Sequence, residues 1–199
     1  MKKFAFVLII LGISLLSVGG YQFISAKVSE QNSLNEARKL VSKETSIQTS
    51  VDEDIATTQT QSYLPVRGET IGIIEIPSIN TELPIVEGTE ADELEKGVGH
   101  YIGSAFPSEK DQIVLSGHRD TVFRNLGKVK VGDIFIIKMP YGEFTYEMVD
   151  YKIVEADDRT VIKSTAPEET LILTTCYPFG YIGDAPQRYI VYAKPVIND

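Results

Sequence analysis

The chain has 199 residues, of which 43% are hydrophobic and 24% charged. This is the composition of one globular domain with flanking segments, and it excludes a fibrous or wholly disordered protein. The formal net charge is −9, and no basic stretch alternates with aromatic residues, so we expect no nucleic-acid partner.

The N-terminus carries an apolar segment. Lys2 and Lys3 precede residues 4–26, which are apolar with mild interruptions. As a helix rising about 1.5 Å per residue, this segment spans roughly 34 Å, enough to cross a bilayer core. The two lysines favour a cytoplasmic N-terminus and an exported remainder. We therefore predict that residues 1–26 form a signal anchor.

A cleaved signal peptide is the alternative. Val18 and Gly20 have the −3 and −1 spacing of a cleavage site before Tyr21. The apolar stretch continues through Phe23 and Ile24, longer than the hydrophobic region of a usual signal peptide, and this favours the anchor. In either case the rest of the chain is expected outside the cytoplasmic membrane.

Residues 27–64 are expected to form a flexible or partly helical stalk. Residues 27–43 contain helix formers with a weak apolar face, whereas residues 44–62 are rich in Thr, Ser, Gln and acidic residues. Such a polar stretch cannot bury a core and is typical of a tether. The folded domain is then expected over residues 65–199.

From residue 65 onward, short runs of β-branched and aromatic residues recur between turn residues, as strands prefer. The predicted strands are 71–76, 83–88, 112–117, 133–138, 143–150, 151–155, 169–175 and 188–196. Two brief helices are expected, one over residues 89–97 and one from Asp120 or Thr121 to Leu126. This pattern predicts an all-β fold, a closed or nearly closed β-barrel.

Cys176 is the single cysteine of the chain. Exported proteins use cysteines in pairs because an oxidising compartment joins them, so an unpaired thiol is a liability unless it is used. A small buried hydrophobe is the alternative interpretation. However, Cys176 follows the strand 169–175 and precedes a loop with Pro178 and Gly180, which places it at a barrel rim. We therefore interpret Cys176 as a nucleophile.

A nucleophilic cysteine needs a base or a cationic neighbour, because an ordinary thiol is mostly protonated at neutral pH. Two histidines exist: His118 stands at a strand end, and His100 lies in a glycine-rich loop. Arg188 begins the last strand, so its guanidinium can return beside the thiol and hold an oxyanion. For His100 a structural position is as plausible as a substrate contact, and for Arg188 the alternative is a solvated charge.

Three short motifs resemble the signature of the sortases, Gram-positive cysteine transpeptidases with an eight-stranded barrel. They are Ser-Gly-His at 116–118, Leu-Thr-Thr-Cys at 173–176 and Gln-Arg-Tyr at 187–189. The TCYPF and APQRY contexts and the single N-terminal anchor are similar to class D members, and the resemblance covers residues 70–196. One departure is Ile172, where the usual Thr-Leu-x-Thr-Cys pattern has its first threonine; we expect it to pack inward and to matter little to the chemistry.

The resemblance implies a reaction and its partners. Cys176 would attack the carbonyl after the Thr of an LPxT-type sorting signal and form a thioester, while His118 would transfer protons and Arg188 would hold the oxyanion. The acceptor would be an amine of a peptidoglycan precursor, so that a surface protein becomes attached to the wall. Weaker candidates for substrate binding are Thr175, Leu173, Ser116 and His100.

No cofactor and no metal are expected. Asp92, Glu93 and Glu95 invite a calcium site, but they lack spaced oxygen ligands and are interpreted as a helix face. Asp120 could orient His118, although helix capping is the preferred interpretation. We expect neither a lid nor the additional N-terminal helix of the pilus-building sortases, which weakens an assignment as a pilin polymerase.

Two alternatives remain open. The first is an extracytoplasmic cysteine peptidase that only hydrolyses. The caspase motif is missing, papain-like enzymes place the cysteine before the histidine, and L,D-transpeptidases place the two close together, whereas here 58 positions separate His118 from Cys176. The second is a non-enzymatic wall-binding module, which leaves the unpaired cysteine without a purpose.

Overall fold

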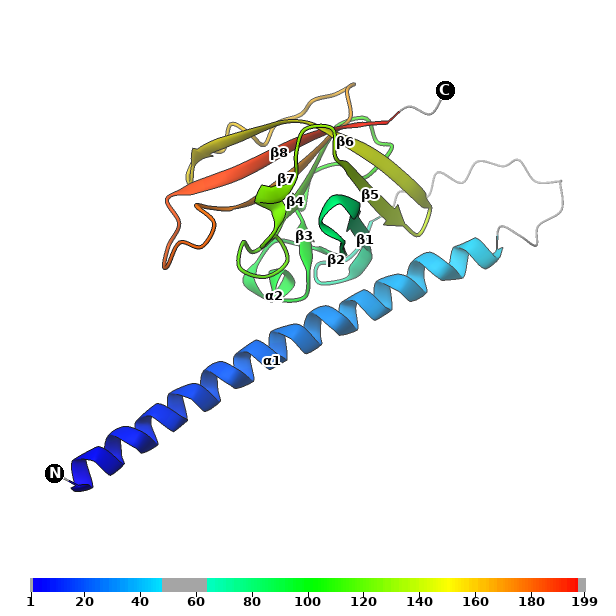
Figure 1. The fold of residues 1–199 in the computed structure, drawn as a ribbon. Helices are drawn as coiled ribbons and strands as arrows, with labels where there is room; N and C mark the ends of the chain where they lie inside the picture. The colour runs from blue at the N-terminus through cyan, green and yellow to red at the C-terminus, as the bar shows by residue number, and fades with distance from the viewer. Residues whose placement is uncertain (1, 48–63, 197–199) are drawn as a thin grey trace.

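Eight strands close into a barrel in the computed structural model, which describes residues 2–47 and 64–196 (Figure 1). The strands are β1 (Thr70–Ile76), β2 (Thr81–Glu87), β3 (Val98–His100), β4 (Gln112–Ser116), β5 (Ile134–Met139), β6 (Gly142–Glu155), β7 (Thr170–Tyr177) and β8 (Gln187–Pro195). Their order around the barrel is β1-β2-β3-β4-β7-β8-β6-β5. The helical elements are α1 (Lys2–Ile47), α2 (Ala91–Leu94), η1 (Pro77–Ile79) and η2 (Leu126–Lys128). The predicted all-β barrel behind an N-terminal helix is confirmed.

One strand was predicted as two. Residues 143–150 and 151–155 form the single strand β6, whose pairing with β8 shifts register between Met148 and Asp150. A bulge of this kind switches the face on which alternate side chains lie. The alternation before the bulge therefore does not continue after it, and the sequence reads as two strands.

The third strand was predicted as a loop. The glycine-rich segment of β3 pairs parallel with β2 and antiparallel with β4. A Cβ atom at Gly99 would lie 2.3 Å from the carbonyl oxygen of Gly88. Glycine is thus required by the close approach of another backbone, not by a turn.

The helix expected at residues 89–97 is shorter than predicted and begins two residues later, at Ala91. Its N-cap is Glu90, whose backbone N–H donates to Oε2 of Glu93 at 3.0 Å in a capping box. Glu93 is therefore a buried capping residue and not part of an exposed acidic helix face.

The barrel interior is filled by alternate residues of every strand. The inward-facing side chains include Ile74, Ile76, Leu83, Ile85, Val98, Ile113, Leu115, Phe135, Ile137, Tyr146, Met148, Leu171, Leu173, Val191 and Ala193. This period of two is what a closed barrel requires. Because these side chains pack as one core, a peptide has to be bound on the outer surface or at the rim.

The second half of α1 packs against the barrel. Leu34 and Ala37 are buried against Ile73 of β1, with Val41 partly buried beside them. Residues 27–42, within the segment predicted as a flexible or partly helical stalk, therefore form a helix that is docked on the barrel. The polar part of the predicted stalk at residues 48–62 lies outside the described residues.

Polar contacts fix the position of this helix along the barrel. Arg38 donates two hydrogen bonds to the carboxylate of Glu82, at 2.9 and 2.6 Å. The bond from this guanidinium holds the pKa of Glu82 below its ordinary value. The hydroxyl of Thr70 donates to Oε2 of Glu36 at 3.0 Å. Together with the apolar contacts, these bonds hold α1 at one height on β1 and β2.

The first half of α1 extends beyond the barrel (Figure 1). Its apolar side chains are exposed, from Val7 at 61% to Ile24 at 63%. By length and composition this helix is able to cross a membrane, and none of its most apolar window is buried in the protein.

A carboxylate at Ala37 is expected to detach the docked helix while leaving the barrel folded. Ala37 is fully buried, so the Ala37→Asp variant would bury a charge without a partner, at a cost of at least about 2 kcal/mol. Hydrogen exchange on the full chain should become faster in residues 27–42 only. Asn35→Asp, on the exposed side of the same helix, is the control and should leave exchange unchanged. Unchanged exchange in Ala37→Asp would contradict the docked arrangement.

Candidate active site

Two of the three candidate catalytic residues lie on neighbouring strands, Cys176 on β7 and Arg188 on β8, and His118 follows the end of β4. On these strands the odd-numbered residues Leu115, Leu171, Leu173, Tyr189 and Val191 belong to the barrel core. The even-numbered residues Val114, Ile172 and Ile190 form a separate cluster on the outer face. Because side chains alternate along a strand, Cys176 and Arg188 face outward. Ile172 also packs outward, which corrects the inward position predicted for it.

Strand register places Cys176 beside Arg188, and the end of β4 on the other side of β7. Cys176 and Arg188 are direct partners in the antiparallel pair β7–β8, and side chains so opposed lie about 4.5–5.5 Å apart at Cβ. On the other side of β7, Ser116 of β4 is level with Thr174. His118 lies two residues beyond Ser116, and Cys176 lies two residues beyond Thr174. Arg188 is therefore beside Cys176 on β8, and His118 follows the strand that pairs with the other side of β7.

The backbone at the end of β4 is tied to β7. The N–H of Gly117 donates to the carbonyl of Thr174 at 3.1 Å, and the hydroxyl of Thr175 donates to the carbonyl of Gly117 at 2.7 Å. A Cβ atom at Gly117 would lie 2.6 Å from the ring of Phe123, whose own N–H donates to the carbonyl of His118 at 3.0 Å. The residue before His118 is thus fixed on both sides.

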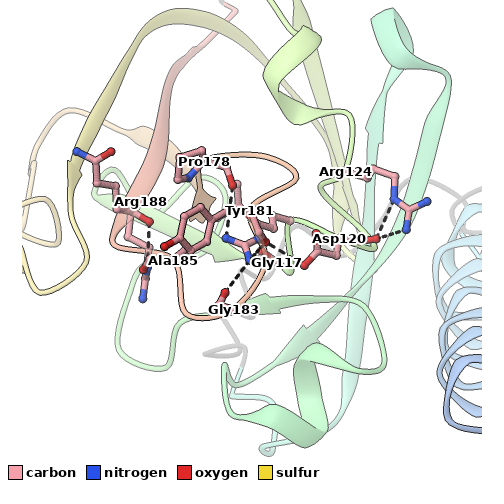
Figure 2. A network of polar contacts seen from close by, with 11 residues as sticks. Gly117, Asp120, Arg124, Pro178, Tyr181, Gly183, Ala185 and Arg188 are labelled. Carbon is pink, nitrogen blue, oxygen red and sulfur yellow. Dashed lines mark hydrogen bonds and ion pairs between the residues drawn. The ribbon is translucent and has the colours of Figure 1, made fainter. Parts of the chain in front are cut away.

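Exposure differs among the three residues. Cys176 is a free thiol of intermediate exposure, His118 is exposed and Arg188 is half-buried. Nη1 of Arg188 donates to the carbonyls of Ala185 and Gln187 at 3.2 and 3.0 Å, as Figure 2 shows in part. A guanidinium has five N–H donors, so three remain to bind a carbonyl or an oxyanion.

The weaker candidates occupy different environments. Thr175 is 3% exposed and orients the chain before His118, and Leu173 is fully buried in the barrel core. Neither position presents its side chain to a substrate in this structure. Ser116 is half-buried and lies on the same outward face as Cys176. Of the weaker candidates on β4 and β7, Ser116 is the one that lies beside the site.

His100 is a structural residue in this arrangement. It is 2% exposed on β3 and stacks on Phe106 at 4.3 Å between ring centroids. Nδ1 lies 2.7 Å from a carboxylate oxygen of Glu87, and Nε2 lies 3.0 Å from the hydroxyl of Ser104 and 3.1 Å from the carbonyl of Ala105. Both ring nitrogens are engaged inside the protein, which corrects the prediction that His100 binds substrate.

Arg119 is the residue that the sequence did not point to. It is only 8% exposed, and its guanidinium reaches the loop 178–186 between β7 and β8, of which Figure 2 labels Pro178, Tyr181 and Gly183. Nη2 donates to the carbonyls of Tyr181 and Gly183 at 2.6 and 2.9 Å, and Nη1 donates to that of Pro178 at 3.4 Å. The loop that joins Cys176 to Arg188 is therefore held by the residue next to His118.

Asp120 does not sit as predicted either. Its carboxylate, expected to cap a helix, is exposed and lies 3.4 Å from Nε of Arg119. The chain that follows makes turns and then the 3₁₀ helix η2, so the second predicted helix is reduced to a short turn.

Aromatic side chains hold the other end of the same loop. Phe179 packs edge-on against Tyr177 at 5.7 Å and against Tyr189 at 5.4 Å between centroids. The ring of Phe179 also lies against Gly127, where a Cβ atom would come within 2.6 Å of it. The loop 178–186 is thus fixed by an aromatic cluster at its start and by Arg119 along its length.

Known proteins match this chain over most of its length. The family model for the sortase domain matches residues 74–196. Sortase D of Bacillus subtilis (strain 168) is 48% identical over 185 residues, 93% of this chain and 93% of the relative. Sortase A of Streptococcus agalactiae (serotype III, strain NEM316) is 28% identical over 180 residues, 86% of this chain and 68% of the relative.

Solved structures share the fold. The Sortase D5 transpeptidase of Clostridium perfringens superposes with a TM-score of 0.66 at 26% identity, covering 85% of this chain and 99% of that one. Sortase C from Clostridium perfringens SM101 superposes with a TM-score of 0.61 at 28% identity, covering 92% and 99%. The chain therefore belongs to the sortase family of cysteine transpeptidases, and within it to class D. This membership removes the alternative of a non-enzymatic wall-binding module.

Loss of the hydrogen bonds that the guanidinium of Arg119 donates is expected to make the loop between β7 and β8 more mobile. Hydrogen bonds from a charged donor contribute about 1.5–3 kcal/mol, so Arg119→Gln should speed amide exchange in residues 179–186 about tenfold or more. Arg119→Lys should restore little of the protection, because an ammonium cannot span several carbonyls as the planar fork does. Arg159→Gln, an exposed arginine in the segment between β6 and β7, is the control. Equal exchange in all variants would contradict the role given to Arg119.

Proposed function

We propose that the chain is a membrane-anchored sortase that cleaves an LPxT-type sorting signal after Thr and transfers the surface protein to a peptidoglycan amine. The observation that supports this most strongly is the pairing of Cys176 with Arg188 on β7 and β8, with His118 directly after β4, the parallel neighbour of β7. A nucleophile, a proton-transfer group and a multi-donor cation are the three parts that acyl transfer needs.

The reaction follows from these positions. The thiolate of Cys176 attacks the carbonyl carbon after Thr, and the electron pair of the carbonyl moves to oxygen, where N–H donors of Arg188 hold the negative charge. His118 protonates the leaving amine, the C–N bond breaks, and a thioester remains on Cys176. The amine of the acceptor then attacks the thioester, His118 takes up its proton, and the thiolate departs.

An external site suits a long substrate. The odd-numbered residues of β4, β7 and β8 fill the barrel, so the sorting signal has to lie along the outer rim. His118 is exposed there, which gives an incoming amine direct access to the group that accepts its proton. The same exposure admits water, so hydrolysis of the thioester is the competing reaction. The peptidase alternative therefore differs from the transpeptidase only in whether water or an amine attacks the thioester.

The anchor is proposed to place this site close to the cell membrane. Lys2 and Lys3 at the start of the apolar segment favour a cytoplasmic N-terminus and an extracytoplasmic barrel. Ala26, at the end of that segment, lines a small cavity together with His118 and Thr121. A site so close to the end of the apolar segment favours an acceptor amine carried by a lipid-linked peptidoglycan precursor.

Removal of any of the three side chains is expected to abolish transfer while the barrel stays folded. Cys176→Ala removes the nucleophile. His118→Ala should lower the rate by about 10²–10⁴-fold, and Arg188→Ala by about 10²–10³-fold. The measurement uses the full chain with an LPxT peptide and a small amine, followed by mass spectrometry of both the aminolysis and the hydrolysis products. Arg124→Ala, another arginine near the rim, is the matched control and should transfer normally.

Two results would count against the proposal. Normal turnover by Cys176→Ala would remove the thioester mechanism. Cleavage without aminolysis, across several acceptor amines, would instead favour a cysteine peptidase on the same fold.

A further inference from the structure

The loop between β7 and β8 ends in an exposed apolar tip, Tyr181-Ile182. Ile182 is 97% exposed, more than any other large hydrophobic side chain whose exposure the structure describes, and Tyr181 is 46% exposed. A fully exposed isoleucine at the tip of a loop gains nothing for the fold. Its side chain is therefore available to contact a surface outside the barrel.

The backbone of this tip is fixed by hydrogen bonds from inside the protein. Arg119 donates to the carbonyls of Tyr181 and Gly183, the two residues that flank Ile182. Gly183 has a φ of +94°, which lets the chain turn immediately after the tip. The backbone on both sides of Ile182 is thus fixed by a buried guanidinium (Figure 2). A backbone that is held on both sides of Ile182 lowers the entropic cost of a contact made by its side chain.

The tip lies on the side of the barrel toward the apolar half of α1. Figure 1 shows the loop between β7 and β8 at the end of the barrel that faces the N-terminus of the helix. Docking through Leu34, Ala37 and Arg38 fixes the barrel on the second half of α1. Ala26 and Lys27, where the apolar segment ends, line a cavity with His118. A membrane crossed by the apolar half would therefore lie against the end of the barrel that carries the tip.

We propose that Tyr181 and Ile182 insert into the surface of the bilayer and form a second membrane contact beside the anchor. The proposal rests on the membrane anchoring given under the proposed function. A net charge of −9 gives no general attraction to anionic lipids, so the contact has to be apolar. Tyrosine is enriched where a protein meets the interface of the membrane, and isoleucine enters the acyl region. The partner is a phospholipid surface, and its effect is to hold the loop beside Cys176 at the level of the headgroups.

The lack of tryptophan in the chain allows a direct test with single-tryptophan variants. Ile182→Trp reports on the tip, Leu15→Trp on the anchor, and Tyr141→Trp on the β5–β6 hairpin at the opposite end of the barrel. Each full chain is reconstituted into phosphatidylcholine vesicles with or without lipids brominated along the acyl chain. Circular dichroism confirms that each variant is folded.

The proposal predicts strong quenching at position 15, quenching at position 182 by lipids brominated close to the headgroup, and no quenching at position 141. Adding Arg119→Gln to Ile182→Trp should reduce the quenching, because the tip is no longer held outward.

The outcomes separate the two proposals. Quenching at position 15 with the signal at 182 equal to that at 141 would overturn the membrane contact and leave the anchor intact. An unquenched position 15 would overturn both. A tip that is unquenched in vesicles but changes emission when a soluble LPxT peptide is added would be a peptide-binding surface instead.

Discussion

The pairing of β4 with β7 is the constraint on which the rest of the site depends. This pair is parallel, so its two strands end at the same rim, and the residues that follow them are delivered side by side. The tie continues past the last residue of β4, where the N–H of Gly117 bonds to Thr174 and the hydroxyl of Thr175 bonds to the carbonyl of Gly117. Because register fixes which face each residue shares, a slip of one residue here would move His118 away from the face of Cys176.

A second layer of contacts extends this arrangement to the substrate side. Arg119, directly after His118, holds the loop that leaves Cys176 and returns at Arg188. The turn with the proton-transfer group and the loop between nucleophile and cation are therefore one connected unit. The docked helix adds a constraint from outside, because Arg38 and Ala37 fix the height of the barrel on α1. The barrel sets the register of the strands that carry the site, and the docked helix sets the orientation of the barrel relative to α1.

Most strands and the three candidate catalytic residues could be predicted from the sequence because their signals are local. Seven of the strands follow from runs of β-branched and aromatic residues, and Cys176, His118 and Arg188 stand at strand ends. What sequence reasoning missed depends on neighbours far along the chain. Arg119 reads as a surface charge because its partners lie about sixty positions away, and His100 reads as a loop residue because Gly99 is required by contact with Gly88. The docking of α1 had only a weak local signal, the apolar face of residues 27–43, whose partner Ile73 lies far along the chain.

The hydrogen bond from Thr175 to Gly117 offers the most direct test of this account. Thr175→Val keeps the shape of the side chain but removes the hydroxyl, whereas Thr175→Ser keeps the hydroxyl. The rate of acyl-enzyme formation on Cys176 is measured by acid quench and intact mass after mixing the full chain with an LPxT peptide. A misplacement of reacting groups by about 1 Å can cost up to about 10²-fold, so the valine variant should form the thioester much more slowly and the serine variant at nearly the original rate. Equal rates in both variants, with both proteins folded, would contradict the claim that the β4–β7 tie sets the active site.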